Sequence, residues 1–259
     1  ISLRRLVRAL QEGETVRIRG DVGGRLGSSM GVDLVRFGGS GGPVEGTGRI
    51  IVDGDVGSRM GISMLRGSIY VSGRIEQPMG NVIEVETDQS GFRKFVSLTE
   101  ALERSMTVLE PNCLEEGRLT ISDGILRDTI GARTGSGGSI LIEGDAGMST
   151  GILMRSGAID LSGDADRNTG VLMRGGRIVV RGNAGDFTGA EMRGGEIFVA
   201  GSAGSFACAM MKGGSIYARD GRPVPPAALH ALSPSEISSV ARVLEISPLH
   251  AMIYRRIGL

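Results

Sequence analysis

The sequence predicts an all-β protein that folds as a single-stranded parallel β-helix, a β-solenoid with about 19 residues in each coil. Four glycines recur every nineteen residues without drift: Gly144, Gly163, Gly182 and Gly201. A short apolar strand precedes each of these anchor glycines, and single residue types recur at fixed positions after it. A unit with one short strand cannot bury its own apolar face, so successive units are expected to stack.

Aliphatic residues occupy the positions four and two before nearly every anchor glycine. The pairs are Val16/Ile18, Ile50/Val52, Ile69/Val71, Ile140/Ile142, Ile159/Leu161, Ile178/Val180, Ile197/Val199 and Ile216/Ala218. A spacing of two predicts a strand with one buried face. Stacked strands lie about 4.8 Å apart, so we expect Ile178 and Ile197 to be neighbours in adjacent coils.

Two more columns follow each anchor glycine. A second glycine recurs seven positions later, at Gly27, Gly61, Gly80, Gly151, Gly170 and Gly189. A methionine recurs ten positions later, at Met30, Met64, Met154, Met173, Met192 and Met211. We expect the glycines at corners and the methionines inside about eight coils. The composition suits such a core, because 44 residues are Gly, 3% are aromatic and none is Trp.

The chain divides into five segments by this pattern. They are an N-terminal cap over 1–14, a first set of coils over 15–86, a helical spacer over 87–117, a second set of coils over 118–220 and a C-terminal extension over 221–259. Leu34–Gly48 breaks the period and is predicted to be a degenerate coil or a projecting loop. We favour one continuous rod with a helical excursion, and two stacked halves stay open.

Two helices are predicted from their start signals. Ser97 and Glu100 form a capping box that opens a short helix in the spacer. Ser233 and Glu236 form another, with Pro234 at the first helical position of a C-terminal helix that runs to about Glu245. Open solenoid ends invite aggregation, so both chain ends are expected to cap the rod. The alternative for the C-terminal helix is an arm that docks on a partner protein.

The composition argues against some classes of binding partner and indicates a cellular compartment. Twenty-nine basic residues balance twenty-nine acidic ones, so no global field attracts nucleic acid or an anionic membrane. Cys113 and Cys208 form no metal-ligand or redox spacing, which indicates a reducing cytoplasm. The apolar runs are too short to span a membrane, and the basic start ISLRRLVRALQEGE has no signal-peptide core. We therefore expect a cytoplasmic protein.

Polar residues directly after the anchor glycines form a column of Asp and Asn that ends in Ser. Its members are Asp21, Asp55, Asp145, Asp164, Asn183 and Ser202. Stacked carboxylates hold calcium in β-rolls, but that motif repeats as a nonapeptide, which the nineteen-residue period does not accommodate. We expect these side chains to bond their own backbone in turns. Phosphate binding is not predicted, because a strand and not a helix follows each glycine-rich loop.

Basic residues directly follow the recurring methionines. These are Arg155, Arg174, Arg193 and Lys212, named here the basic ladder. The basic ladder is the predicted partner-docking site, because such a line can receive an acidic surface of a partner or an anionic cofactor tail. A solvated row of charges is the alternative.

The remaining candidates for chemistry are few. Cys208 stands where earlier coils have Gly, which predicts a relaxed last corner, with a reactive thiol as the alternative. His230 and His250 have no neighbouring Cys or acidic triad in the sequence. No catalytic, cofactor-binding or metal-ligating residue is predicted.

The columns GDAG…G…MRGG and the block GNAGDFTGAEMRGG closely resemble the GXGXG-repeat family, over Thr15–Glu86 and Leu119–Asp220. Its members include the C-type subunit of formylmethanofuran dehydrogenase and the C-terminal domain of the glutamate synthase large subunit. The resemblance implies a right-handed β-helix. The chain departs from the dehydrogenase pattern in the spacer Thr87–Gly117 and in its proline-rich tail.

The resemblance also implies a function. The dehydrogenase subunit is a non-catalytic scaffold in methanogenesis that holds a metallohydrolase-like subunit and a molybdenum- or tungsten-pterin subunit while CO2 is reduced onto methanofuran. The alternative is a stand-alone glutamate synthase GXGXG subunit, which supports glutaminase and FMN domains in glutamate biosynthesis. This chain itself would bind no cofactor. Its complex would carry Mo/W-pterin and Fe-S clusters, or FMN and Fe-S clusters in the alternative.

Three other possibilities stay open. The chain could be an independent enzyme, because some relatives carry an esterase label. It could be an anion-binding module, in which case reversing the charges of Arg174 and Arg193 together abolishes salt-sensitive ligand binding. The rods could also associate with each other as a homo-oligomer.

Overall fold

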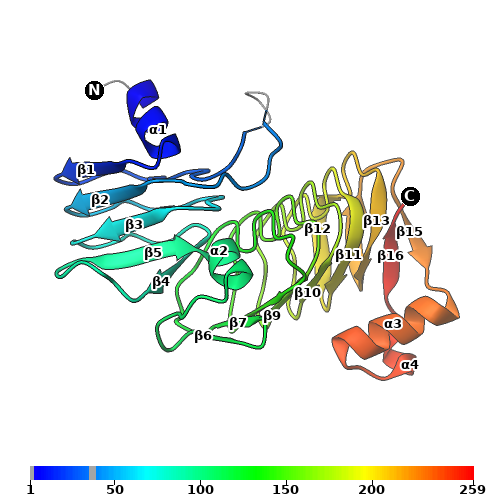
Figure 1. Ribbon diagram of the computed structural model, residues 1–259. Coiled ribbons are helices and arrows are strands. Elements are labelled where there is room, and N and C mark those ends of the chain that lie inside the picture. The colour runs from blue at the N-terminus through cyan, green and yellow to red at the C-terminus, as the bar shows by residue number, and fades with distance from the viewer. Residues whose placement is uncertain (1–2, 35–38) are drawn as a thin grey trace.

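A computed structural model describes residues 3–34 and 39–259 as a rod of stacked coils (Figure 1). The helices are α1 (Leu3–Gln11), α2 (Leu98–Glu103), α3 (Pro234–Leu244) and α4 (Pro248–Ala251). The strands are β1 (Thr15–Arg19), β2 (Arg49–Asp53), β3 (Ser68–Val71), β4 (Val82–Val85), β5 (Arg93–Ser97), β6 (Cys113–Glu115), β7 (Arg118–Ile121), β8 (Ser139–Ile142), β9 (Ala158–Leu161), β10 (Arg177–Val180), β11 (Arg193–Val199), β12 (Ser202–Ala207), β13 (Gly213–Ala218), β14 (Asp220–Pro223), β15 (Ala228–Ala231) and β16 (Arg255–Gly258). The predicted β-solenoid is confirmed.

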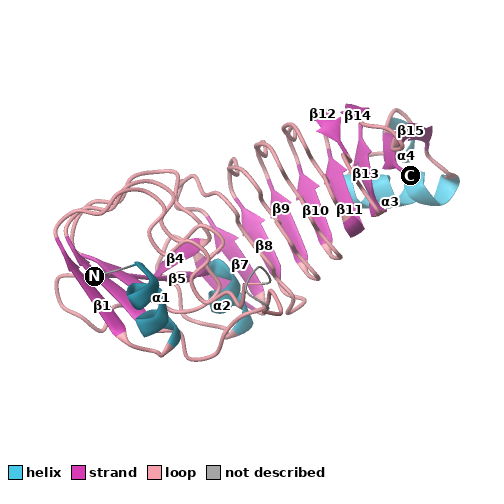
Figure 2. Cartoon of the chain, turned by 90° about the horizontal axis from the view of Figure 1, so that it is seen from above, coloured by secondary structure: helices cyan, strands magenta, loops and turns pink. Residues whose placement is uncertain are grey.

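Among the described residues, nine parallel strands each begin a coil, where about eight were expected. Strands β1, β2 and β3 pair in a five-stranded sheet, and strands β7, β8, β9, β10, β11 and β13 pair in a nine-stranded sheet. Figure 2 shows these strands side by side along the rod. The additional coil begins at β7, whose residues Leu119 and Ile121 are not among the eight aliphatic pairs read from the sequence.

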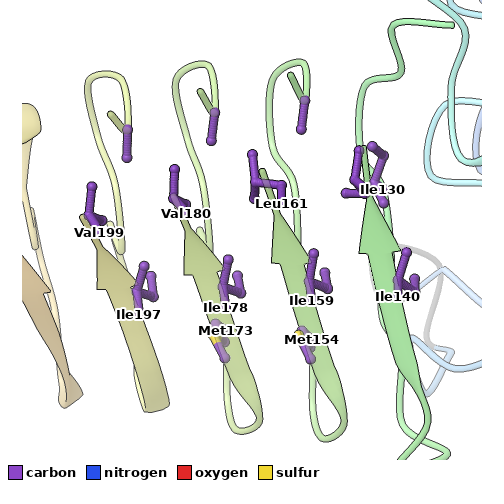
Figure 3. Packing of buried hydrophobic residues seen from close by; sticks show 14 of the residues in the cluster. Ile130, Ile140, Met154, Ile159, Leu161, Met173, Ile178, Val180, Ile197 and Val199 are labelled. Atoms are coloured by element: carbon purple, nitrogen blue, oxygen red, sulfur yellow. The ribbon is translucent and has the colours of Figure 1, made fainter. Parts of the chain in front are cut away.

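The strands stack in the predicted register. Ile178 of β10 pairs with Ile197 of β11 on one side and with Ile159 of β9 on the other. These three side chains form a column that Figure 3 shows inside the coils, and each is fully buried. The methionine column is also buried, because Met154, Met173 and Met192 have no exposed surface. Each buried side chain therefore packs against the same kind of side chain in the next coil, as the sequence predicted.

The spacer joins the two coil sets without breaking the rod. Met79 of the first set forms a parallel bridge with Arg127 of the second. Its N–H donates to Leu126 O at 2.9 Å, and its carbonyl accepts from Asp128 N at 2.8 Å. The continuous rod that we favoured is thus correct, although the sheet itself is interrupted at this point.

The expected coil over Ser68–Glu86 is wrong in its second half. Strand β4 turns back as an antiparallel hairpin with β5, and β5 pairs antiparallel with β3. Helix α2 follows at once, with Ser97 as the predicted N-cap and five buried residues. Because the hairpin and α2 fill the layer between β3 and β7, no parallel strand can occupy it.

The predicted capping boxes differ in outcome. At α3 the box is complete, since Ser233 Oγ and the Glu236 carboxylate each accept from the other residue's backbone N–H. At α2 only half forms: Ser97 Oγ accepts from Glu100 N at 2.9 Å. The Glu100 carboxylate instead pairs with Arg104, four residues later in the sequence, at 3.0 Å.

The C-terminal extension caps the rod. Strand β16 pairs antiparallel with β13 and so covers the edge of the last coil, and β15 pairs with β16. Helix α3 packs through Val240, Ala241 and Leu244 on the outer face of the sheet, against Phe198 and Tyr217. The capping role is therefore correct, and docking of the C-terminal helix on a partner protein stays a prediction.

The N-terminal end is covered less completely. Leu10 of α1 packs on the core of the first coils, and an apolar cavity of about 480 Å³ remains between α1 and the first coil. Val32, just before the interruption Leu34–Gly48, forms an antiparallel bridge with Pro43 inside it, which closes a loop instead of a coil. Residues 1–2 of the predicted cap and 35–38 of this loop lie outside the described residues.

Candidate functional site

The basic ladder lies on consecutive turns just before the strands of the long sheet. Arg155, Arg174, Arg193 and Lys212 are all exposed. The backbone N–H of each donates to a carbonyl of the preceding coil, at 2.8 Å for the three arginines and 2.7 Å for Lys212. The four cations therefore stand one above another at the spacing of the coils, about 4.8 Å. Figure 3 marks the place by Met154 and Met173, which directly precede two of them.

The basic ladder is not neutralised by the described part of the chain. None of its four cations has a carboxylate oxygen within 4.0 Å there, whereas nearby Arg177 pairs with Glu196 at 3.1 Å. The turn that leads to Arg193 contains two acidic residues, Asp186 and Glu191, and neither forms an ion pair with the ladder. Two like charges about 4 Å apart in water repel by about 1 kcal/mol. A bound anion would reduce this repulsion between the stacked cations.

Arg133 extends the basic ladder by one coil. Burial lowers the pKa of Arg133, and the charges of Arg155 and Arg174 lower it further, so the three guanidinium groups share one field. Its Nη1 donates to Gly41 O at 2.7 Å, while its buried Nε has no partner among the described residues. Arg133 was missed in the sequence because it lies two positions before the ladder position of its own coil. The signal was the irregular coil: Gly131 and Gly151 are twenty residues apart.

The Asp/Asn column holds the coils together. Asp145 Oδ1 accepts from Asp164 N at 2.7 Å, and Asp164 Oδ1 accepts from Asn183 N at 2.6 Å. The expectation that these side chains bond their own turns is wrong, because the N–H of the next coil lies directly over each carboxylate. No group of three or more His, Cys, Asp or Glu side chains suited to a metal occurs in the described ranges.

Cys208 has the same left-handed backbone conformation as the glycines at the corresponding corner of earlier coils. Its φ is +59°, close to the +65° of Gly189, so the prediction of a relaxed corner is wrong. A Cβ at Gly189 would lie 2.7 Å from Ile216 Cδ1. The coils end one layer later, and Sγ of Cys208 lies 3.8 Å from the Ile257 carbonyl of the capping strand. The side chain therefore occupies space that an isoleucine takes in earlier coils.

We expect Cys208 to be unreactive in the folded protein. It is 1% exposed, and burial raises its pKa to about 12, so almost no thiolate exists at neutral pH. In a Cys113→Ser variant, Ellman's reagent should find no thiol at pH 7.5 and one thiol per chain in guanidinium chloride. Stoichiometric reaction of the folded variant within minutes would contradict this and revive the reactive-thiol alternative.

A cleft of about 270 Å³ beside α2 holds a perturbed carboxylate. Burial raises the pKa of Glu100, although Arg104 and Arg66 act in the opposite direction. The other charged groups of the cleft are paired: Arg66 with Glu103, and Lys94 with Asp88 at 3.0 Å. Arg104 pairs with Glu100 itself at 3.0 Å, so each of these cations faces a carboxylate and the cleft offers no unpaired charge to hold an anion.

This raised pKa predicts a pH-dependent effect of Glu100→Gln. The folded protein holds the Glu100 proton more tightly than the unfolded chain, so the free energy of unfolding falls as pH rises through the range above 4.5. The variant should therefore gain in melting temperature relative to the wild type between pH 4 and pH 8. Glu143→Gln, at an exposed position, is the control and should show no such trend. If the melting temperature of the variant falls relative to the wild type as pH rises, the ion pair with Arg104 outweighs the effect of burial on Glu100.

The two histidines do not form a site. His230 Nε2 lies 3.3 Å from the Gly258 carbonyl, and His250 is an exposed residue of α4 tilted against Tyr254. In the parts of the chain that the structure covers, no helix combines the length and apolar character needed to cross a membrane.

Comparison with known proteins gives one informative match. No model of a protein family matches the chain. An uncharacterized protein of Methanothermobacter thermautotrophicus (strain Delta H) is 48% identical to it over 157 residues. The match covers 60% of this chain and 51% of that protein, so the chain spans about half the length of its relative. The resemblance to the GXGXG-repeat family therefore stays a prediction that stands on the residues quoted above.

Proposed function

We propose that this chain is a non-catalytic structural subunit of a multi-subunit redox enzyme complex, most similar in role to the C-type subunit of formylmethanofuran dehydrogenase. The observation that carries the proposal is the basic ladder: unpaired cations displayed at a fixed spacing on the side of a stiff rod. Capping strands cover the last coil, so the rod offers its sides and not its C-terminal edge to partners. The surface so displayed is suited to docking.

Two further observations support this role. The relative in Methanothermobacter thermautotrophicus is a protein of a methanogen, which agrees with the methanogenesis role that the family resemblance implies. Cys113 and Cys208 are both free thiols, which accords with a cytoplasmic complex. In this proposal the pterin and Fe-S cofactors belong to the partner proteins, and this chain sets the distance between them.

Purification of the tagged chain from its own organism tests the proposal. We expect stoichiometric co-purification of a pterin-binding subunit and an amidohydrolase-like subunit, identified by mass spectrometry, together with molybdenum or tungsten. Co-purification of glutaminase and FMN-domain proteins, with flavin, would replace this function by the glutamate synthase alternative. A chain that purifies without partners, or that alone hydrolyses simple esters, would overturn the structural role.

A further inference from the structure

We propose that the basic ladder binds the acidic face of an α-helix of a partner protein, with the helix axis parallel to the rod. The inference rests on the proposed docking function and names the kind of surface that docks. The binding surface consists of Arg155, Arg174, Arg193 and Lys212, with Arg133 at one end.

The spacing of the cations favours a helix. Four rungs about 4.8 Å apart span roughly 14 Å. On an α-helix, acidic residues at i, i+3, i+7 and i+10 share one face and span about 15 Å at 1.5 Å per residue. Each carboxylate can therefore meet its own cation, because the mismatch over the whole length is about 1 Å, well within the reach of an arginine side chain.

An extended segment fits the same surface poorly. Residues on one face of a strand are two apart, about 6.6 Å, so four of them span roughly 20 Å. The register with the basic ladder is lost after two rungs, because the accumulated difference reaches about 5–6 Å over the four. The spacing of the basic ladder therefore favours a helical partner over an extended one.

The chemistry of the rungs also suits carboxylates. Three of the four cations are arginines, whose planar guanidinium groups bind carboxylates through two parallel hydrogen bonds. One exposed pair contributes only about 0.2–1 kcal/mol, so useful affinity needs several rungs at once. Arg133, half-buried at one end of the surface, lies in the field of Arg155 and Arg174 and adds positive charge there.

Peptide binding to the purified chain tests the inference. The main probe is a fluorescent alanine-based helical peptide with Glu at i, i+3, i+7 and i+10. One matched probe has the same composition with its four glutamates spread around the helix, and another holds four glutamates in an extended Glu-Pro repeat. Inorganic phosphate at equal ionic strength is the fourth probe, because a small-anion site would bind it. We expect the main probe to bind at least tenfold more tightly than the matched peptides, with affinity that falls as salt rises.

Charge reversal locates the binding surface. Arg174→Glu combined with Arg193→Glu should weaken binding of the main probe at least tenfold. The control is Arg167→Glu combined with Arg242→Glu, which makes the same change in net charge at two exposed arginines without ion pairs among the described residues. The control should change affinity less than threefold. Circular dichroism of both variants checks that the rod remains folded.

The possible outcomes separate the two proposals. Equal binding of all peptides, equal effects of the two double variants, or competition by phosphate alone would overturn the acidic-helix inference. A native complex that forms with the Arg174→Glu/Arg193→Glu chain would also overturn it, while leaving the structural function intact. A wild-type chain that purifies without partners would overturn the structural function itself, whatever the peptides do.

Discussion

Replacing Gly195 with Ala is expected to destabilise the rod by about 2–4 kcal/mol. Gly195 has φ of +94°, a conformation that costs a residue with a Cβ about 1 kcal/mol or more. A Cβ there would also lie 2.7 Å from Met173 Cε and 2.8 Å from Gly176 O of the preceding coil. Overpacking adds about 1–3 kcal/mol, because a backbone atom cannot move aside. Thermal unfolding followed by circular dichroism should show a loss of about 5–15 °C.

Gly137→Ala is the matched control for this substitution. Gly137 also has positive φ, +79°, but a Cβ there would meet nothing within 4 Å. We therefore expect the backbone cost alone, about 1 kcal/mol. Equal losses for the two variants would show that close coil stacking contributes nothing and would contradict the packing described here.

Arg127→Ala is expected to cost about 3–5 kcal/mol and to loosen the junction between the two coil sets. Arg127 is 1% exposed, its Nη1 donates to Asp123 Oδ1 at 2.7 Å, and its Nε donates to Val82 O at 3.0 Å. Burial raises the pKa of Asp123, but the hydrogen bonds and charge of Arg127 outweigh this, so the pKa is lowered overall. Without Arg127 a largely buried carboxylate loses its cation. Urea or thermal unfolding measures the loss.

Two further variants identify the cause of that loss. Arg118→Ala removes an exposed arginine that forms no ion pair with the described residues and should change stability by less than about 0.5 kcal/mol. Arg127→Met combined with Asp123→Asn removes both charges and should recover more than half of the lost stability. If the double variant is as unstable as Arg127→Ala, the uncompensated charge is not the reason.

The repetitive part of this protein could be predicted closely from the sequence. Each coil repeats the environment of the previous one, so a column such as Ile159, Ile178 and Ile197 records the core directly. The capping signal at Ser233 and Glu236 is local and gave the correct bounds of α3 within one residue. The basic ladder was visible for the same reason, since its backbone follows the period of the coils.

The errors lie where the period ends or a non-local contact decides. The second half of the Ser68–Glu86 block has the alternation of a coil strand, yet it pairs antiparallel with β5, which occupies the place next to β3. Glu100 has the sequence of a capping box, but its carboxylate pairs with Arg104 one turn later, and the tertiary structure buries its side chain. Arg133 does not occupy a ladder position in the sequence, but in the folded chain it lies close enough to Arg155 and Arg174 for their charges to lower its pKa.

The sequence alone therefore determined the coil, its register, its buried columns and the line of exposed cations, because stacking turns a regular spacing along the chain into a regular spacing along the rod. Only the tertiary structure decided how the rod is joined and closed. The burial of Arg127 at the junction and the pairing of β16 over the last coil depend on which segments meet in space. Such meetings occur once, so no repeat in the sequence records them.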